Sequence, residues 1–315
     1  MLNLTYDVNS NDSKIETIKI GINVWPGYSH AFIAQEMGFF EKNNVDVELI
    51  LYKEYSETQN LYLNGKVDGV FEVFADSIFH NFDGVDTKIV YVADHSTSGD
   101  VIIGIGNSLS ELKGKKIGVE GFNSFSHIFV LKALENAGLT EKDVEFVNVP
   151  AHNVLLYLED GKIHAGHTWE PTKSDAIKKN YNVLVESGEI PGIITDVLAF
   201  NKKIIQERPE DIKSIVKSIL EARNFLQTNR DEAISIMAEQ TGMSFEEMEQ
   251  GVIGVHHPNL EENINTMINS EDSTSLPSTG RFIANFYLER GQINKMPNFD
   301  EIIDPTFLRQ IAADT

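Results

Sequence analysis

Apolar and polar residues alternate in a series of short segments, and most of these segments are followed by a run with helical spacing. The first segment, 17–23 (TIKIGIN), leads through the turn 24–30 into a helix that stops near Gly38. Further strands are predicted at 45–52, 69–74, 88–93, 101–106, 116–120, 144–149, 165–169, 182–186 and 195–200. This alternation is typical of an α/β fold with parallel sheets covered by helices, in which ligands lie beyond the carboxyl ends of the strands.

The stretch 115–139, KKIGVEGFNSFSHIFVLKALENAGL, shows the unit clearly. It predicts a strand that breaks at Gly121, a polar turn, and a helix over 125–137. The Ser- and Asn-rich turn leaves N–H groups and hydroxyls available for an anion or another polar ligand. An ordinary helix cap without a ligand is the alternative.

After Arg208 the pattern becomes helical. Helices are predicted at 210–228, 230–240, 244–251 and 277–291. We interpret the chain as two lobes, one inserted into the other, with the apolar strands 101–106 and 195–200 crossing the hinge. The predicted divisions are a disordered leader or linker at 1–16, lobe 1 at 17–104 plus 201–315, and an inserted lobe 2 at 105–200.

Charge narrows the choice of partners. The 315 residues carry 26 Lys and Arg against 48 Asp and Glu, a formal net charge of −22. Nucleic acid and anionic membrane surfaces attract cationic proteins, so neither is expected as a partner. No apolar run is long enough to span a membrane, and the first residues lack the apolar core of a signal peptide. The protein is therefore either cytoplasmic or a form that begins after a removed signal.

Several motifs together resemble the type II periplasmic-binding-protein family, in its nitrate/sulfonate/taurine and thiamine-pyrimidine branch. The stretches that carry the resemblance are WPGY at 25–28, AQEMGFFEKNNVDVE at 34–48, LKGKKIGVE at 112–120, SFSHIFVLKALENAGL at 124–139, HTWEP at 167–171 and PGIITDVLAF at 191–200. Together with the helical run at 208–239, they cover most of residues 17–260.

This resemblance implies a two-lobed, extracytoplasmic receptor that closes about a hinge on a small molecule. It would deliver the ligand to an ABC permease driven by an ATPase. We expect the receptor to be a monomer and to need no cofactor. A lipoprotein form is consistent with the absence of cysteine, since a protein anchored through its first cysteine would have a remainder free of cysteine. The positions implied to bind ligand are Trp25, Tyr28, Asp76, Asp100, Glu120, Ser124, Ser126, His127, Trp169, Glu170 and Asp196. Phe122 and Phe125 depart from the smaller residues that relatives often have.

The candidate residues point to the chemistry of the ligand. Trp25 and Trp169, the only tryptophans, either pack in the core or sandwich a flat or cationic ligand. Asp100, Glu170 and Asp196 lie in or beside apolar strands, as lobe-edge charges or as partners for N–H groups of a ligand. Because the candidate set contains no Lys or Arg, we expect an amine-containing molecule such as taurine or an aminopyrimidine, not a simple anion.

Metal binding is the weaker alternative. His127, His164, His167 and Glu170 are the candidates, but His164 and His167 would point to opposite faces of a strand. Zinc needs at least three converging ligands, so no metal site is expected. His127 is equally compatible with a helix surface.

An enzyme is not expected. The chain has no nucleophile elbow and no phosphate-binding glycine loop. The pyrimidine-forming enzymes of the same fold carry a cysteine-rich segment, whereas this chain has no cysteine. A ligand sensor that signals to a kinase remains a second possibility.

Overall fold

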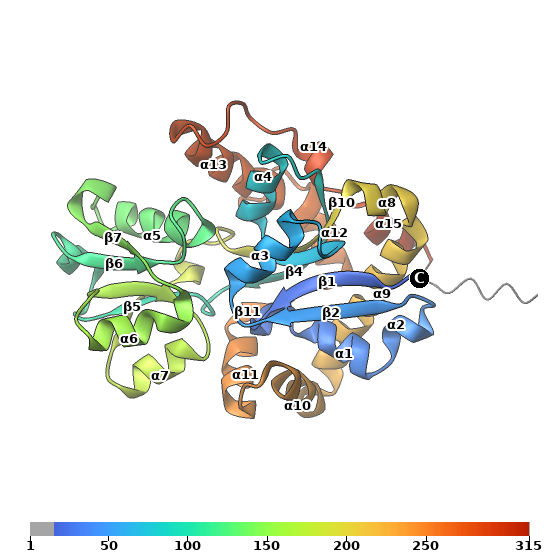
Figure 1. Cartoon of the computed structure of the whole chain (residues 1–315), viewed down its shortest axis with the longest axis horizontal. Helices are drawn as coiled ribbons and strands as arrows, with labels where there is room; N and C mark the ends of the chain where they lie inside the picture. Colours follow the sequence, from blue (N-terminus) through green and yellow to red (C-terminus); the bar gives the residue numbers. More distant parts are fainter. Residues whose placement is uncertain (1–15, 315) are drawn as a thin grey trace, which may run out of the picture.

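The computed structural model describes residues 16–314, so the predicted leader at 1–16 lies, apart from Glu16, outside the described residues. The chain forms two α/β units, each built on its own sheet (Figure 1). The expected two-lobed α/β architecture is therefore confirmed.

The larger unit contains a six-stranded sheet in the order β11-β4-β10-β3-β1-β2. Its strands are β1 (Ile18–Asn23), β2 (Val47–Tyr52), β3 (Gly69–Val73), β4 (Thr87–Ser96), β10 (Thr195–Asn201) and β11 (Val255–His256). β1 is parallel to β2 and β3, whereas β10 is antiparallel to β3 and β4. Ile18, Ile20 and Ile22, which share one face of β1, are fully buried, and Gly21 and Asn23 on the opposite face are buried as well, in keeping with a strand covered on both faces.

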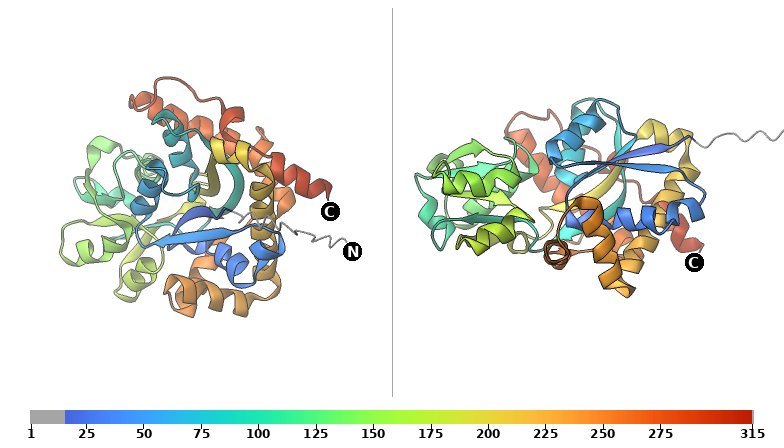
Figure 2. Two further views of the ribbon diagram at one scale, coloured as in Figure 1. Left: turned by 45° about the vertical axis from the view of Figure 1, so that its right-hand side comes forward. Right: turned by 60° about the horizontal axis from the view of Figure 1, so that its bottom comes forward.

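Helices cover both faces of this sheet (Figures 1 and 2). The amino-terminal half of the chain supplies α1 (His30–Glu36), α2 (Phe39–Lys42), α3 (Tyr55–Leu63) and α4 (Phe74–Phe82). The rest are α8 (Lys202–Glu207), α9 (Pro209–Thr228), α10 (Arg230–Thr241), α11 (Phe245–Ile253), α12 (Leu260–Ile268), α13 (Leu276–Glu289), α14 (Phe299–Ile302) and α15 (Thr306–Ala313). The sequence pattern predicted α9, α10, α11 and α13 but not α12, α14 or α15.

The smaller unit, mostly green in Figure 1, contains a five-stranded sheet in the order β7-β6-β8-β5-β9. Its strands are β5 (Val101–Gly104), β6 (Lys116–Val119), β7 (Glu145–Asn148), β8 (Ala165–Thr168) and β9 (Asn182–Glu186), and its helices are α5 (Phe125–Asn136), α6 (Val154–Glu159) and α7 (Thr172–Lys178). The predicted helix at 125–137 thus matches α5. β5 runs antiparallel to β8 and β9, so both sheets are mixed and not wholly parallel as expected.

The expected lobe boundaries at 104 and 200 need correction. β5 belongs entirely to the smaller sheet and β10 entirely to the larger one. The chain therefore changes sheets between Ser96 and Val101 and again between Glu186 and Thr195. Neither strand crosses the hinge, because an apolar strand pairs its N–H and C=O groups along its whole length within one sheet.

The first segment that connects the two sheets, between Ser96 and Val101, is held by hydrogen bonds to Gly254, which is distant in the sequence. The N–H groups of Thr97, Ser98 and Gly99 all donate to the carbonyl oxygen of Gly254, at 2.8–2.9 Å. Gly99 also lies against the backbone of Gly254 and the indole of Trp25. The hinge is thereby fixed next to the turn that carries Trp25.

No helix among residues 16–314 is long and apolar enough to cross a membrane.

Candidate functional site

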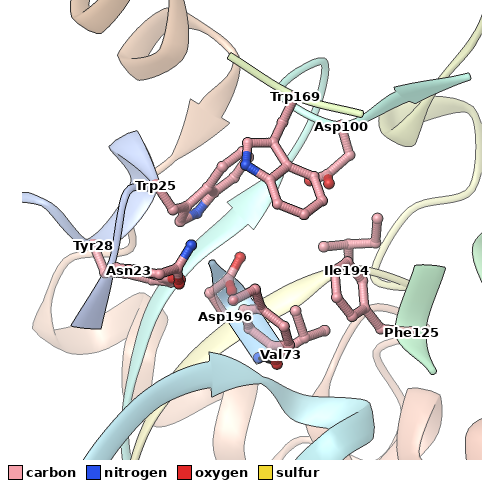
Figure 3. A pocket seen from close by; sticks show the side chains of 10 residues that line it. Asn23, Trp25, Tyr28, Val73, Asp100, Phe125, Trp169, Ile194 and Asp196 are labelled. Atoms are coloured by element: carbon pink, nitrogen blue, oxygen red, sulfur yellow. Dashed lines mark hydrogen bonds between the residues drawn. The ribbon is translucent and has the colours of Figure 1, made fainter. Parts of the chain in front are cut away.

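A small cavity lies where the two units meet, beyond the strand ends (Figure 3). Its lining consists of Asn23, Trp25, Tyr28, Tyr55, Val73, Asp100, Phe125, Trp169, Ile194 and Asp196. The cavity volume is about 10 Å³, which is close to the minimum for one water molecule. A larger ligand therefore needs the two units, or these side chains, to move apart.

Aromatic rings from both units form most of the wall. The rings of Trp25 and Trp169 meet edge to face, with centroids 6.2 Å apart, and Phe125 lies 6.1 Å from Trp169. Tyr55 of α3 contacts Phe125 of α5 at 5.1 Å. Each of these contacts except that between Phe125 and Trp169 joins the two units, so the two tryptophans pack against each other across the boundary between the units.

Two carboxyl groups lie side by side at the base of the site. Asp94 of β4 pairs directly with Asp196 of β10 in the antiparallel register. The indole N–H of Trp25 donates to Asp94 Oδ2 at 3.2 Å. Burial raises the pKa of Asp94 to about 8, and burial followed by the charge of Asp94 raises the pKa of Asp196 well above its usual range.

A third carboxylate is fixed by a hydrogen-bonded chain. His167 of β8 contacts Asp100 Oδ1 through Nε2 at 2.9 Å and Ser126 Oγ through Nδ1 at 2.8 Å. The Ser126 hydroxyl also accepts the N–H of Glu120. This arrangement leaves Asp100 Oδ2 buried beside the cavity, with no hydrogen-bond partner within residues 16–314. Asp94 Oδ1 is likewise buried without a hydrogen-bond partner within these residues.

The turn that carries Trp25 and Tyr28 is held by two buried histidines. His30 Nδ1 and His257 Nε2 both lie within 3.0 Å of the Gly27 carbonyl oxygen, to which each donates. Burial lowers the pKa of His30 to about 4 and that of His257 well below its usual range, so both rings are neutral near pH 7. Tyr28 donates to Asn23 Oδ1, and burial raises its pKa far above the usual value.

A second recess of about 40 Å³ lies on the other side of Tyr55 and Trp169. Glu120 and Glu170 line it, together with Glu54 and His152, and the contact of 2.9 Å between His152 Nδ1 and Glu54 Oε2 joins the units. Burial raises the pKa of Glu120 to about 7 and raises that of Glu170. Glu170 Oε2 accepts the N–H of Ser174, so its carboxylate faces this recess and not the aromatic cavity.

The remaining predicted residues lie outside the aromatic cavity. Asp76 accepts the Tyr55 hydroxyl at 2.6 Å and faces the N–H of Phe125, and burial raises its pKa to about 6. Ser124 caps α5 by accepting the His127 N–H. His127 points away from the cavity, 4.5 Å from Phe146, and burial lowers its pKa to about 4. The structure thus brings together Trp25, Tyr28, Asp100, Trp169 and Asp196 in one cavity.

Among the described residues, no group of three or more His, Cys, Asp or Glu side chains is arranged to hold a metal ion. His167 is buried against Asp100 and Ser126, whereas His164 Nδ1 lies near the backbone N–H of Lys116. The two histidines therefore have separate partners.

Sequence reasoning missed Asn23, Tyr55, Phe125 and Asp94. The sequence pattern predicts that β4 stops at Ala93, which leaves Asp94 outside it. Only the pairing of Asp94 with Asp196 in the sheet shows that Asp94 belongs to the site. Asn23 ends β1 directly before the WPGY turn, a position that could have marked it. Phe125 was noted as a departure from relatives, and the structure places it in the cavity wall.

Comparison with curated proteins gives relatives of several functions. The chain is 26% identical over 216 residues to a putative thiamine biosynthesis protein of Haemophilus influenzae, covering 66% of this chain and 68% of the relative. It is 30% identical over 142 residues to the taurine-binding periplasmic protein of Escherichia coli, covering 42% and 44%. It is 25% identical over 227 residues to the 4-amino-5-hydroxymethyl-2-methylpyrimidine phosphate synthase of Candida albicans, covering 66% of each.

Solved structures share the fold. The aliphatic sulphonate binding protein SsuA of Escherichia coli superposes with a TM-score of 0.76 at 18% identity, covering 92% of this chain and 93% of that one. The nitrate-binding protein NrtA of Synechocystis gives 0.80 at 14%, covering 96% and 89%. A zinc-bound ligand-binding component of an ABC-type import system from Staphylococcus aureus gives 0.78 at 15%, covering 94% and 98%.

The profile of one protein family matches more than half of the chain. It is described as NMT1/THI5 like, and it spans residues 25–233, from the WPGY turn through both crossings between the sheets into α10. This span includes every residue of the aromatic cavity except Asn23. The chain therefore belongs to the NMT1/THI5-like family.

Proposed function

We propose that this protein is the extracytoplasmic solute-binding protein of an ABC importer and that it binds a small amine-containing organic molecule between its two units. The observation that carries the proposal is the cavity itself. It presents Asp100 and Asp196 inside an aromatic wall, and its lining contains no Lys or Arg among the described residues.

The carboxyl groups favour N–H donors in the ligand. Buried carboxylates are costly unless they are paired, and Asp100 Oδ2 has no partner in residues 16–314. An ammonium, amidine or aminopyrimidine N–H supplies the missing donor, and a cation beside an indole gains roughly 0.5–2 kcal/mol. Taurine is less well matched than an aminopyrimidine, because the cavity offers no cationic group to its sulfonate.

Binding by closure is part of the proposal. The ligand would contact Trp25, Tyr28 and Asp196 from the larger unit and Phe125 and Trp169 from the smaller one. A ligand that contacts both units stabilises the closed arrangement relative to an open one. The permease would then recognise the closed form, and the chain would act as a monomer outside the cytoplasm, on a lipid anchor.

The first experiment is a thermal-shift screen of the purified protein. The compounds are taurine, alkyl sulfonates, 4-aminopyrimidine, putrescine, nitrate and zinc chloride. A ligand that binds only the native state raises the melting temperature, by an amount that grows with ligand concentration over Kd. A rise with 4-aminopyrimidine or putrescine that is lost in Asp100→Asn supports the proposal. A rise with nitrate alone would contradict it.

Three other functions make different predictions. A metal-binding role predicts a rise with zinc chloride alone, and zinc analysis of the purified protein checks it directly. An enzyme of the pyrimidine-forming kind predicts turnover of a bound ligand, which mass spectrometry of the incubated compound would show. A signalling role is tested by whether deletion of the gene abolishes ligand uptake.

A further inference from the structure

The Asp94–Asp196 pair consists of two buried acidic side chains. They lie together because the register between β4 and β10 places them directly opposite each other. The two residues are direct partners across β4 and β10, with a bulge immediately after Asp196. Side chains of directly opposed residues on one face lie close together, and like charges at such positions repel each other. Asp94 is fully buried and Asp196 is 3% exposed, so water does not screen the repulsion.

No positive group neutralises the pair among the described residues. The groups that act on it are Trp25 from the first turn, Asp100 from the first segment between the sheets and Asp76 from α4, and the neutral Tyr28 hydroxyl lies in the field of both carboxyl groups. These groups are neutral or acidic, and Asp100 is itself occupied by His167. Two buried carboxyl groups at directly opposed positions cannot both ionise without a positive partner, so the pair holds a proton between them.

We infer that the site takes up a cationic amine in exchange for the proton held between Asp94 and Asp196. The inference rests on the proposed function and adds how binding is regulated. When the ammonium group enters beside Asp196, its positive charge replaces that of the proton, which leaves for water. The pair then carries one more negative charge and the ligand one positive charge, so the total charge of the site is unchanged.

The exchange makes proton binding and amine binding competitive. Affinity for the amine should fall by up to about tenfold for each pH unit below the range in which the pair loses its proton. An acidic local environment would therefore favour release of the ligand. A neutral ligand would show no such dependence.

Trp25 reports on the pair without any ligand. Its indole N–H donates to Asp94 Oδ2, and Trp25 and Trp169 are the only tryptophans in the sequence. In the Trp169→Phe variant, all tryptophan fluorescence comes from Trp25. We expect its emission to change in a single step between pH 6 and pH 9, roughly the range around the pKa of about 8 for Asp94.

The control variants keep the shape of the pair and remove its charge. Asp94→Asn and Asp196→Asn, each combined with Trp169→Phe, should abolish the step. The same step in both variants would overturn the inference, as would a flat profile in the parent. If an Asn variant fails to fold, infrared spectroscopy of the Glu120→Gln variant provides the answer, because Glu120 also titrates near pH 7 and a protonated carboxyl band that disappears between about pH 7 and pH 9 without it comes from the pair.

Calorimetry then measures the exchange itself. Titration of putrescine, which is cationic at pH 7, in buffers of different ionisation enthalpy should show close to one proton released per ligand bound, whereas 4-aminopyrimidine, which is mostly neutral at this pH, should show almost none. Binding of putrescine without proton release would overturn the exchange and leave the proposed function standing. If neither amine binds at millimolar concentration, the proposed ligand class fails, and the exchange fails with it, even where the Trp25 step is present.

Discussion

At the scale of single residues, Asp100 has two oxygens with different tasks. Oδ1 contacts His167, which ties the residue to Ser126 and to β6 of the smaller unit. Oδ2 is buried beside the cavity without a partner in the described chain. The carboxylate is thus oriented by one oxygen so that the other is available to a ligand.

We therefore expect Asp100→Asn to weaken amine binding by about 10- to 100-fold, because a hydrogen bond to a charged group contributes roughly 1.5–3 kcal/mol. Isothermal titration with 4-aminopyrimidine measures the change. Glu239→Gln, at an exposed position on α10, is the matched control and should bind as the parent does. Equal affinities of Asp100→Asn and the parent would show that Asp100 does not contact the ligand.

Gly27 allows the close packing behind Trp25. A Cβ atom at this position would collide with Asp94 Oδ2 and Trp25 Nε1. We expect Gly27→Ala to lower the free energy of unfolding by about 1–3 kcal/mol, as overpacking in a filled core does. Chemical denaturation followed by circular dichroism checks this value.

Gly118→Ala in β6 is the comparison for that variant. Its Cβ would lie 3.0 Å from the flexible end of Ile163, so its cost should be smaller. A larger loss for Gly118→Ala than for Gly27→Ala would contradict the assignment of Gly27 as a packing site.

At the scale of elements, the two units meet where three helices begin. Tyr55 opens α3, Asp76 lies in the first turn of α4, and Phe125 opens α5 of the other unit. The Tyr55 hydroxyl donates to Asp76 and accepts the N–H of Val73, while its ring packs on Phe125. Glu120 of the smaller unit in turn faces the N–H of Ser56 in α3. Each unit thus places a carboxyl group at a helix start of the other.

We expect Tyr55→Phe to destabilise the protein by about 1–3 kcal/mol, because it leaves the Val73 N–H and the Asp76 carboxyl without their shared partner. Thermal and urea unfolding measure the loss. Tyr52→Phe, whose ring is 37% exposed, is the control and should unfold as the parent does. A Tyr55→Phe variant as stable as the parent would mean that water replaces the hydroxyl at no cost.

At the scale of the whole molecule, buried ionisable groups of two kinds set the pH dependence of stability. Asp76, Asp94 and Glu120 have pKa values raised to about 6, 8 and 7, respectively. Their protons stabilise the fold at low pH, and this contribution is lost as the pH rises through those values. His30, His95 and His127 have pKa values lowered to about 4, so the folded protein binds fewer protons than the unfolded chain below about pH 6.5.

Between about pH 4 and pH 6.5 the two contributions have opposite signs and largely cancel, whereas above about pH 6.5 only the carboxyl groups contribute. We therefore expect the melting temperature to change little between about pH 5 and pH 6.5 and to fall toward about pH 8.5. Differential scanning calorimetry across this range checks the profile. In Asp94→Asn the fall on the alkaline side should be shallower, and a profile parallel to that of the parent would contradict the raised pKa of Asp94.

The sequence by itself determined the α/β class, the two-unit organisation, the family, and most strands and long helices. These follow from local periodicity, which burial on one or two faces imposes on each segment. It also singled out Trp25, Tyr28, Asp100, Trp169 and Asp196, because they lie near strand ends within or beside the family motifs.

Only the tertiary structure decided which of these residues act together. The Asp94–Asp196 pair depends on antiparallel register between strands a hundred residues apart, and the bond from His167 to Asp100 depends on how β8 lies beside β5. The positions of His127 and Glu170 depend on the direction in which each side chain leaves its helix or turn. Periodicity shows which face of an element is buried, but register and packing between distant segments decide what that face meets.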